Sequence, residues 1–253
     1  MKKSFWVTLM FLLVCFLSQA QVEVKENENK TDDKGLRQGY WVEDAGKEVQ
    51  KGNYMDGKRE GCWTVYHENG LLKRAEYYKG GKRNGAVINI DRRGYLTGET
   101  FYKDDLKDGT DKTYVPGGRL VEIANYKMGK LEGEKKVYYQ TTFNIQEESN
   151  YVNDKKEGIS KWYDDKGRLI AEYNYKNGLF EGDQITYYPN GNISTKQSYH
   201  NNRAVGEYTE YYEDGTLKTK GQYVKGEKDG QWYEYDNTGK QTKVIKYKKG
   251  VEM

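Results

Sequence analysis

Residues 61–84, GCWTVYHENGLLKRAEYYKGGKRN, decide the fold, because their pattern returns along most of the chain. Another copy, GEYTEYYEDGTLKTKGQYVKG, spans residues 206–226. A tyrosine column recurs at steps of 24 residues, with one step of 25, at Tyr54, Tyr78, Tyr102, Tyr126, Tyr151, Tyr175, Tyr199, Tyr223 and Tyr247. A glycine column runs in phase with it, at Gly39, Gly61, Gly85, Gly109, Gly133, Gly158, Gly182, Gly206 and Gly230. Self-similarity at a fixed period predicts a repeat array.

Each repeat contains two short runs rich in Tyr, Trp, Thr, Val and Ile, which are the residues that favour strands. Between the runs stands a pair such as Asn69-Gly70, which accepts the positive φ angles of a tight hairpin. A second turn follows the column tyrosine, as in Tyr175–Gly178. No segment shows sustained helical spacing. The sequence therefore predicts an all-β fold: about nine consecutive β-hairpins in an elongated, single-layer, twisted antiparallel sheet.

The column residues are expected to have structural roles. Leu72 and Tyr78 are six residues apart, which places both on one face of the sheet. We expect each column glycine to serve a tight turn or the close approach of a neighbouring ring, so Gly182→Val should destabilise the array locally. One residue is inserted before Phe143 in the fifth repeat, which also lacks the hairpin glycine. A bulge or a longer turn is predicted there.

The chain begins with a segment typical of a secretory signal peptide over residues 1–20. Lys2-Lys3 precede a short apolar run, and small residues at Ser18 and Ala20 predict cleavage after Ala20. A lipoprotein cleaved before Cys15 is the less favoured alternative, because Val14 is larger than the residue expected there. Secretion or a periplasmic location follows from either interpretation. Residues 21–34 are predicted to be a polar linker, and residues 35–253 the repeat array.

The composition excludes some classes of partner. Only 35% of the residues are hydrophobic, yet 25 are Tyr and 29 are Gly, which fits a thin sheet covered by aromatic rings. The net charge of +3 arises from 42 basic and 39 acidic residues. This balance provides no strong field for nucleic acid, which is therefore not expected as a partner.

The order Gly-x-Trp-x-x-Tyr, Asn-Gly-x-Leu and Tyr-x-x-Gly resembles the MORN repeat, in its longer bacterial variant. The tryptophan is kept at Trp41, Trp63 and Trp232, and Tyr208 is similar. The repeats that depart from it carry Val87, Asp111, Lys135, Ser160 and Gln184. The resemblance implies a single-layer sheet of hairpins that serves in protein scaffolding, self-association or phosphoinositide binding. Bacterial proteins with the variant repeat are also often labelled antitoxin components of toxin–antitoxin modules.

Enzyme chemistry is not expected. His67 and His200 are far apart and offer no metal-ligand spacing with Cys62, which we interpret as a small, semi-buried residue. The carboxylate pairs, such as Asp104-Asp105, stand at predicted turns, and no phosphate-binding fingerprint joins a strand to a helix. The sequence therefore predicts a protein without catalytic residues, metal, cofactor or small-molecule substrate.

The sequence favours a secreted or periplasmic, non-enzymatic scaffold that mediates protein–protein interaction, including self-association. The alternatives are glycan or anionic lipid binding at the cell envelope, and an antitoxin. The partner, the oligomeric state and the binding face of the sheet stay open. If aromatic side chains carry the function, the positions that break the repeat pattern are favoured, such as Trp162, Phe180 and Phe143.

Overall fold

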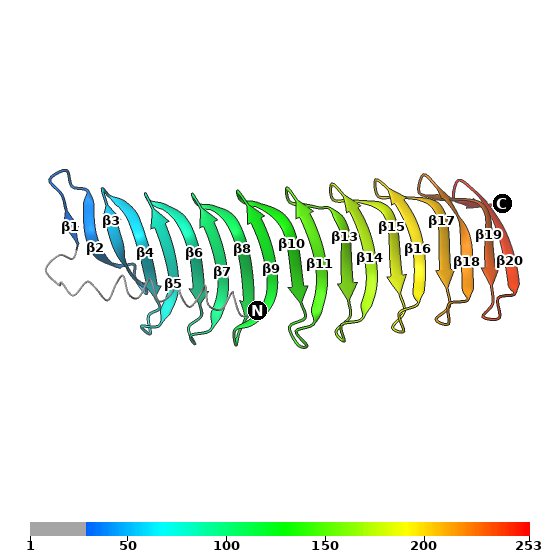
Figure 1. The fold of residues 1–253 in the computed structure, drawn as a ribbon, viewed down its shortest axis with the longest axis horizontal. Helices are drawn as coiled ribbons and strands as arrows, with labels where there is room; N and C mark the ends of the chain where they lie inside the picture. The colour runs from blue at the N-terminus through cyan, green and yellow to red at the C-terminus, as the bar shows by residue number, and fades with distance from the viewer. Residues whose placement is uncertain (1–28) are drawn as a thin grey trace. The chain divides into compact units, whose positions relative to one another are not determined.

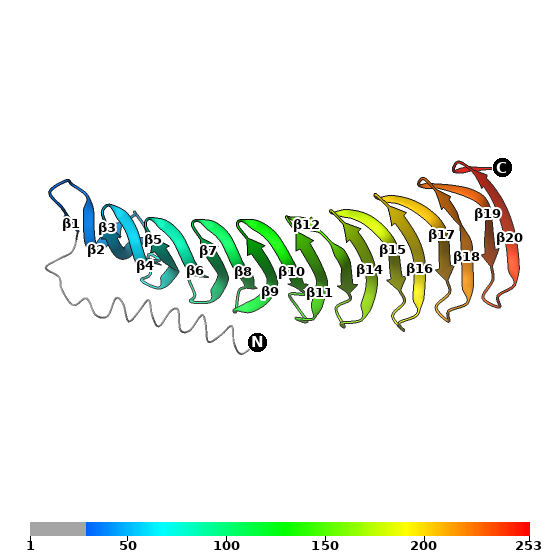
Figure 2. The ribbon, with the colours of Figure 1, turned by 45° about the horizontal axis from the view of Figure 1, so that its top comes forward.

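The computed structural model describes residues 29–253, so the predicted leader, with Cys15 and the cleavage position after Ala20, lies outside the described residues. Every helix or strand assigned between residues 29 and 253 is a β-strand (Figures 1 and 2). The chain divides into two compact units, Met1–Lys130 and Leu131–Met253. The predicted all-β fold of consecutive hairpins is confirmed.

The first unit contains strands that each pair antiparallel with the next along the chain. They are β1 (Lys30–Thr31), β2 (Arg37–Asp44), β3 (Val49–Met55), β4 (Lys58–Tyr66), β5 (Leu72–Lys79), β6 (Lys82–Ile90), β7 (Leu96–Lys103), β8 (Leu106–Val115) and β9 (Arg119–Lys127).

The second unit begins within β10 and repeats the same antiparallel order. Its strands are β10 (Lys130–Tyr138), β11 (Ile145–Val152), β12 (Lys155–Lys156), β13 (Gly158–Tyr163), β14 (Leu169–Lys176), β15 (Leu179–Tyr187), β16 (Ile193–His200), β17 (Arg203–Tyr211), β18 (Leu217–Val224), β19 (Glu227–Tyr235), β20 (Gln241–Lys248) and β21 (Val251–Glu252). The short strands β12 and β13 both pair with β11.

Residues 29–34, within the stretch expected to be a polar linker, already contribute a strand. Lys30 and Thr31 of β1 pair with β2. The Asp32 carboxylate closes the connecting turn, because its Oδ1 accepts bonds from the backbone N–H groups of Lys34 and Leu36, both at 2.9 Å. Hydrogen-bonded structure therefore begins ahead of the repeat pattern at residue 35.

Two kinds of turn alternate along each unit. After each column tyrosine, both central residues of a two-residue turn have positive φ, as at Asn177 (52°) and Gly178 (81°). This is the geometry of a type I′ turn, whose twist matches that of the flanking strands. The other turn is longer in every repeat after the first, whose strands β2 and β3 are joined by a two-residue turn at Gly46 and Lys47. In the next repeat, Gly70 has a φ of 80° and its N–H donates to the carbonyl oxygen of His67 at 2.8 Å.

The pair Asn69-Gly70 was expected to take two positive φ angles, and only the glycine does so. Asn69 keeps an ordinary φ, and its side-chain Oδ1 accepts a bond from the Leu71 N–H at 3.1 Å. The asparagine thus stabilises the turn through its side chain, as Asn does in many turns, and not through a left-handed backbone.

The fifth repeat has the longer turn that its inserted residue predicts. Phe143 takes the place of the missing hairpin glycine, with a φ of 63°, and its N–H donates to the carbonyl oxygen of Tyr139 at 3.1 Å. A bulky residue in this region of φ is unusual, so the backbone of this turn is strained.

The glycine and tyrosine columns face each other within each hairpin, as in the pairs Gly61–Tyr78 and Gly182–Tyr199. A Cβ on Gly61 would meet no atom within 4 Å, so its φ of 71°, and not a neighbouring ring, explains the glycine. The expected close approach of an aromatic side chain occurs at two other column glycines, since a Cβ on Gly85 would lie 3.1 Å from Tyr77 Cβ and one on Gly109 3.0 Å from Phe101 Cβ. The closest approach of a ring occurs outside the column. A Cβ on Gly52 would overlap the Trp63 indole, and a Cβ on Gly221 would overlap the Trp232 indole.

We call the face that carries the tyrosine column the tyrosine face. A row of buried residues also lies on this face. Each member stands two residues after a column glycine or two residues before a column tyrosine. The row includes Trp63, Ala124, Ser160, Gln184, Gln197 and Trp232, all less than 9% exposed. Part of the core of each unit thus lies under the rings of its own sheet, which helps a chain with few aliphatic residues to stay folded. In the first unit, residues of the opposite face such as Thr64, Ala75 and Ile88 are buried as well.

Candidate binding groove on the tyrosine face

A column of cations covers the rings of the tyrosine face. The position two residues before the column glycine is basic in most repeats, and we call these residues the cation column: Arg37, Arg59, Arg83, Lys107, Lys156 and Lys228. The Arg59 guanidinium carbon lies 4.0 Å from the centroid of the Trp63 ring and 5.6 Å from that of Tyr78. Lys228 Nζ lies 4.1 Å from the Trp232 centroid. Such cation–π contacts stabilise the cover over the buried row.

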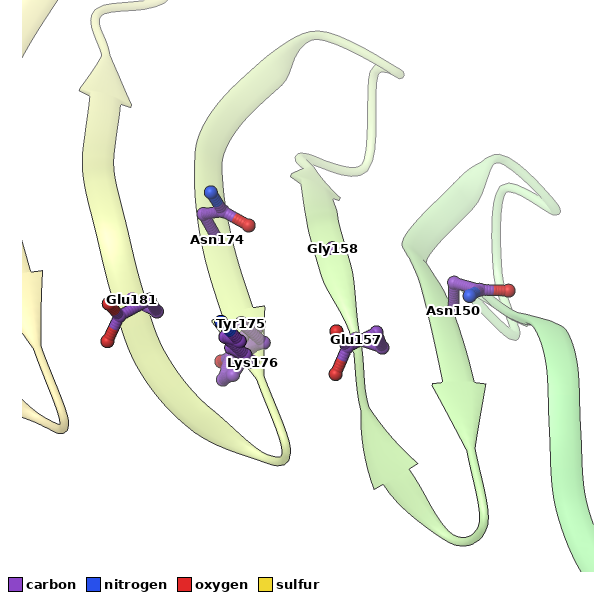
Figure 3. A pocket seen from close by; sticks show the side chains of 7 residues that line it. All are labelled: Asn150, Glu157, Gly158, Asn174, Tyr175, Lys176 and Glu181. Atoms are coloured by element: carbon purple, nitrogen blue, oxygen red, sulfur yellow. The ribbon is translucent and has the colours of Figure 1, made fainter.

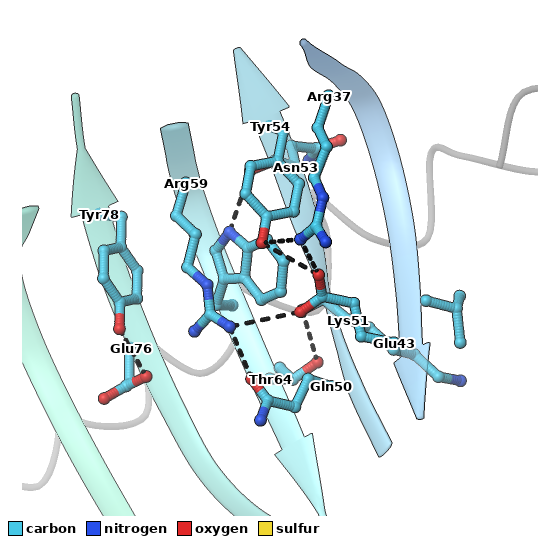
Figure 4. A network of polar contacts seen from close by, with 12 residues as sticks. Arg37, Glu43, Gln50, Lys51, Asn53, Tyr54, Arg59, Thr64, Glu76 and Tyr78 are labelled. Carbon is cyan, nitrogen blue, oxygen red and sulfur yellow. Dashed lines mark hydrogen bonds and ion pairs between the residues drawn. The ribbon is translucent and has the colours of Figure 1, made fainter. Parts of the chain in front are cut away.

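Acidic side chains pair with several of these cations. Glu43 is shared, since Arg37 bonds one of its oxygens and Arg59 lies 3.4 Å from the other (Figure 4). The Tyr54 hydroxyl donates to the same carboxylate at 3.0 Å. In the second unit Lys156 Nζ lies 2.6 Å from Glu147 Oε1. Burial raises the pKa of Glu147, but the bonds from Lys156 and Ser149 outweigh it and lower this pKa below its usual range.

The cation column is interrupted in the second unit, first by Leu131 and then where two successive repeats carry Phe180 and Ala204. The Phe180 ring packs 5.5 Å from the Tyr199 ring and 5.6 Å from the Tyr173 ring, measured between centroids. Ala204 has no side chain long enough to cover Tyr223. A groove of about 600 Å³ opens here, and both Phe180 and Ala204 line it.

Two glutamines line the groove at its buried row. Gln184 and Gln197 are cross-strand partners on β15 and β16, and they are 7% and 6% exposed. Gln184 Nε2 donates to the Asn174 carbonyl oxygen at 3.0 Å, and Gln197 Nε2 donates to that of Val205 at 2.9 Å. Because a carbonyl oxygen only accepts, these bonds fix the orientation of both amides. Both Oε1 atoms are buried and have no hydrogen-bond partner.

Aromatic side chains form the walls of the groove. Tyr173, Phe180 and Tyr199 come from β14, β15 and β16, and Tyr208 and Tyr223 come from β17 and β18. Burial, together with the nearby Glu210 carboxylate, raises the pKa of Tyr208 to about 12. Its phenol is therefore neutral and can donate a hydrogen bond at physiological pH.

The groove is almost uncharged. Arg203 is the one charged residue among those that line it. Next to the glutamines, Thr186 and Thr195 are cross-strand partners whose hydroxyl oxygens lie 2.6 Å apart. The groove therefore combines ring faces with amide and hydroxyl groups, the mixture of aromatic walls and a few polar groups that is typical of small-molecule sites.

The three residues that the sequence singled out as breaking the repeat pattern, Trp162, Phe180 and Phe143, lie in different parts of the second unit. Phe180 lines the groove. Trp162 contacts the Tyr173 ring, with centroids 4.8 Å apart, and so supports one wall without lining the groove. Phe143 lies in the turn between β10 and β11, outside the groove lining. Sequence reasoning missed Ala204, although comparing the residues two positions before each column glycine would have shown it.

A second hollow, of about 340 Å³, lies near the type I′ turns of the same unit (Figure 3). Glu157, between β12 and β13, and Glu181, on β15, lie on either side of β14, which raises the question of a catalytic carboxylate pair. Each carboxylate instead accepts a backbone N–H of a turn, from Asn177 to Glu157 at 2.8 Å and from Asn201 to Glu181 at 3.0 Å. The same bond recurs at Glu60, Asp108, Glu132 and Asp229. These acids therefore stabilise turns.

The histidines and the cysteine show no catalytic arrangement. His67 Nε2 bonds the Ile90 carbonyl oxygen at 3.0 Å, and His200 Nδ1 lies 2.9 Å from Glu181. Cys62 is buried. Over residues 29–253, no group of three or more His, Cys, Asp or Glu side chains is placed to hold a metal ion. That same part of the chain contains no helix with the length and apolar character needed to span a bilayer.

Comparison with known proteins identifies the repeat. The sequence model of the MORN repeat variant matches residues 59–80, 156–177, 180–201 and 204–225. The last three segments contain strands that form the groove. The resemblance drawn from the repeat pattern is thus confirmed, whereas the antitoxin label associated with such proteins finds no support.

Other comparisons add little. No curated protein matches the chain. Among solved structures, one described as the crystal structure of TcdB2-TccC3-Cdc42 aligns at 12% identity with a TM-score of 0.21, over 82% of this chain and 14% of that one. Another, TcdB2-TccC3-TEV, aligns at 13% identity with a TM-score of 0.20, over 86% of this chain and 15% of that one. Likeness at this level carries no argument about fold or function.

Proposed function

We propose that this MORN-repeat protein is a non-enzymatic scaffold that acts outside the plasma membrane and holds its partner on the tyrosine face of residues 131–253. MORN repeats are generally associated with binding to proteins or membrane lipids. The observation that carries the proposal is the groove at Phe180 and Ala204, where the cation that covers the rings in other repeats is missing.

The uncovered rings favour binding, because a partner that covers them removes apolar surface from water. The rest of the array shows the alternative, since Arg59 and Lys228 fill the equivalent position and cover the rings.

Location outside the plasma membrane is supported by the predicted leader, residues 1–20. Mass spectrometry of the protein from its own cells tests it directly. We expect a mature N-terminus at Gln21. A lipidated N-terminus at Cys15 would replace free secretion by membrane anchoring, and an intact Met1 would contradict export.

Anionic lipid is not the partner that this site favours. Recognition of a phosphate-bearing headgroup needs several available cations. Arg203 is the one cation among the residues that line the groove. Cations elsewhere on the tyrosine face, such as Arg59 and Lys156, are paired with carboxylates. We do not propose the antitoxin role, because no observation favours it.

A protein partner is the second candidate. The family association implies it, and tyrosine-rich walls such as Tyr199 and Tyr223 are typical of the residues that dominate protein interfaces. Under this alternative, the material bound at the groove would be destroyed by protease.

The test uses Ala204→Lys, which restores the cation column and blocks the groove. The new lysine is expected to lie over the rings of Tyr208 and Tyr223, as Lys228 lies over Trp232 and Tyr247, so the fold should be kept. The matched control is Lys228→Arg, which keeps the cation in the next repeat. Immobilised mature protein is incubated with an envelope extract of its own cells.

We expect the wild type and Lys228→Arg to retain envelope material that Ala204→Lys does not retain. Equal retention by all three proteins, or retention by none, would show that the groove is not the binding site. Circular dichroism of each variant checks that the sheet is intact.

A further inference from the structure

We propose that the groove between Phe180 and Tyr223 binds a neutral saccharide chain. This inference rests on the proposed function, since it names the ligand class of the same site. Three features support it: the polar side chains of the lining, the aromatic walls and the near absence of charge.

The polar side chains of the lining match the hydroxyl groups of a sugar. Thr186, Thr195 and Asn202 line the groove with hydroxyl and amide groups, which both donate and accept hydrogen bonds. A saccharide presents several O–H groups along its length, each able to bond such a group.

The walls match the C–H faces of sugar rings. Tyr208 and Tyr223 are perpendicular, with an interplanar angle of 83° and centroids 6.1 Å apart, so one wall offers both a ring face and a ring edge. Phe180 and Tyr199 form a tilted pair on the other side, at 56°. Flat rings flanking hydrogen-bonding groups bury the apolar faces of a pyranose while its rim hydroxyls reach Asn202 and the threonines.

The extent of the groove fits a chain of sugars better than a single sugar. Its lining residues come from β14 to β18. Five neighbouring strands spaced by about 4.8 Å extend about 19 Å across the sheet. The ligand would therefore run across the strands, along the rows of the tyrosine face.

The charges favour a neutral saccharide over a peptide or a charged polymer. Among the residues that line the groove there is no carboxylate or lysine, and Arg203 is the one cation. An extended peptide usually adds to the edge of a sheet through main-chain bonds. The groove instead lies on the face of the sheet, where side chains must provide every contact.

Isothermal titration calorimetry tests the inference with neutral oligosaccharides of four to six units, made of β-1,4-linked glucose, β-1,4-linked N-acetylglucosamine or α-1,4-linked glucose. We expect the wild type to bind at least one of the three series. Ala204→Lys should lose at least tenfold in affinity, and Lys228→Arg should keep the wild-type value.

The envelope extract provides the second arm, because it contains ligands outside the panel. It is treated with periodate, which cleaves vicinal diols of sugars, or with protease, before incubation with the immobilised wild type. Loss of groove-dependent retention after periodate, with retention kept after protease, supports a saccharide even if no oligosaccharide of the panel binds.

Retention that resists periodate and is lost after protease would overturn the saccharide and leave the proposed scaffold function intact, with a protein as partner. If Ala204→Lys changes neither oligosaccharide binding nor retention, the groove itself is refuted and both proposals fail together.

Discussion

The two units of this protein are built from the same hairpin, but their tyrosine faces carry different side chains. In the first unit, the residue two positions before each column glycine is always basic, and these residues are Arg37, Arg59, Arg83 and Lys107. In the second unit, the same position reads Leu131, Lys156, Phe180, Ala204 and Lys228. In the first unit, a basic side chain thus covers the rings in every repeat, whereas three repeats of the second unit lack this cation.

The buried rows of both units mix apolar and polar side chains. In the first unit the row includes Trp63, Ala124, Glu76 and Thr100, and in the second it includes Ser160, Gln184, Gln197 and Trp232. Glu76 and Thr100 are bonded to other side chains, whereas the Oε1 atoms of Gln184 and Gln197 have no partner. Polar side chains in a buried row weaken a sheet unless they are bonded. The comparison teaches that shared positions carry stability and that unshared positions mark the candidate site. The predictions below test the shared positions first.

The largest effect is expected where an indole lies on a glycine, a feature that both units share. Gly52→Ala should displace Trp63, and Gly221→Ala should displace Trp232, each at a cost of about 3 kcal/mol. Local stability is measured by hydrogen exchange of the flanking strands. Gly61→Ala is the control, since its Cβ would meet open space and only the backbone is strained. A cost no greater than that of the control would contradict the packing role.

Gly182→Val tests the left-handed column glycine in the second unit. Gly182 has a φ of 83°, and a Cβ there would lie 3.0 Å from the Asn174 side-chain nitrogen, which can move. The backbone strain is therefore the main cost, about 2 kcal/mol. We expect a lower midpoint of urea denaturation, and Gly61→Val in the first unit should cost nearly as much. An unchanged midpoint would remove the conformational role of the column.

A smaller effect is expected from exchanging turn residues between the units. Met128 takes a φ of 49° at a type I′ turn of the first unit, where Asn177 takes 52° in the second. Asparagine tolerates this region better than methionine, so Met128→Asn should stabilise the first unit by about 1 kcal/mol. Asn177→Met should destabilise the second unit by a similar amount. Thermal unfolding measures both, and changes of the same sign would contradict the turn assignment.

The smallest effect on stability is expected from restoring the cover. Ala204→Lys should stabilise the second unit by about 0.5 kcal/mol, because the lysine adds a cation–π contact at a partly exposed site. Lys228→Ala should remove a similar amount from the next repeat. The denaturation midpoints of the two variants should therefore move in opposite directions. Destabilisation by Ala204→Lys would indicate that the groove cannot accommodate a lysine over the rings, as the other repeats do.

The fold could be predicted from the sequence because its determinants are local and repeated. The alternation of side chains, the column residues and the turn glycines all lie within one hairpin. The details that differ, such as the ordinary φ of Asn69, depend on which of two turn types closes each end of the hairpin. A two-residue motif such as Asn-Gly is compatible with both types.

The groove was harder to predict, because it arises from the absence of a side chain. Phe180 drew attention as an aromatic residue, whereas Ala204 did not, and the groove needs both. The unpaired oxygens of Gln184 and Gln197 depend on where their amide nitrogens bond, which is set by carbonyl groups of other strands. Such orientation cannot be inferred from residue spacing.

The most direct test of the account is an NMR titration that follows the side-chain amide signals of Gln184 and Gln197. We expect both signals to shift when the neutral oligosaccharide that binds most tightly is added to the wild type, and to stay unchanged in Ala204→Lys. Shifts confined to other residues, or the same shifts in Ala204→Lys, would contradict the claim that the gap in the cation column is the binding site.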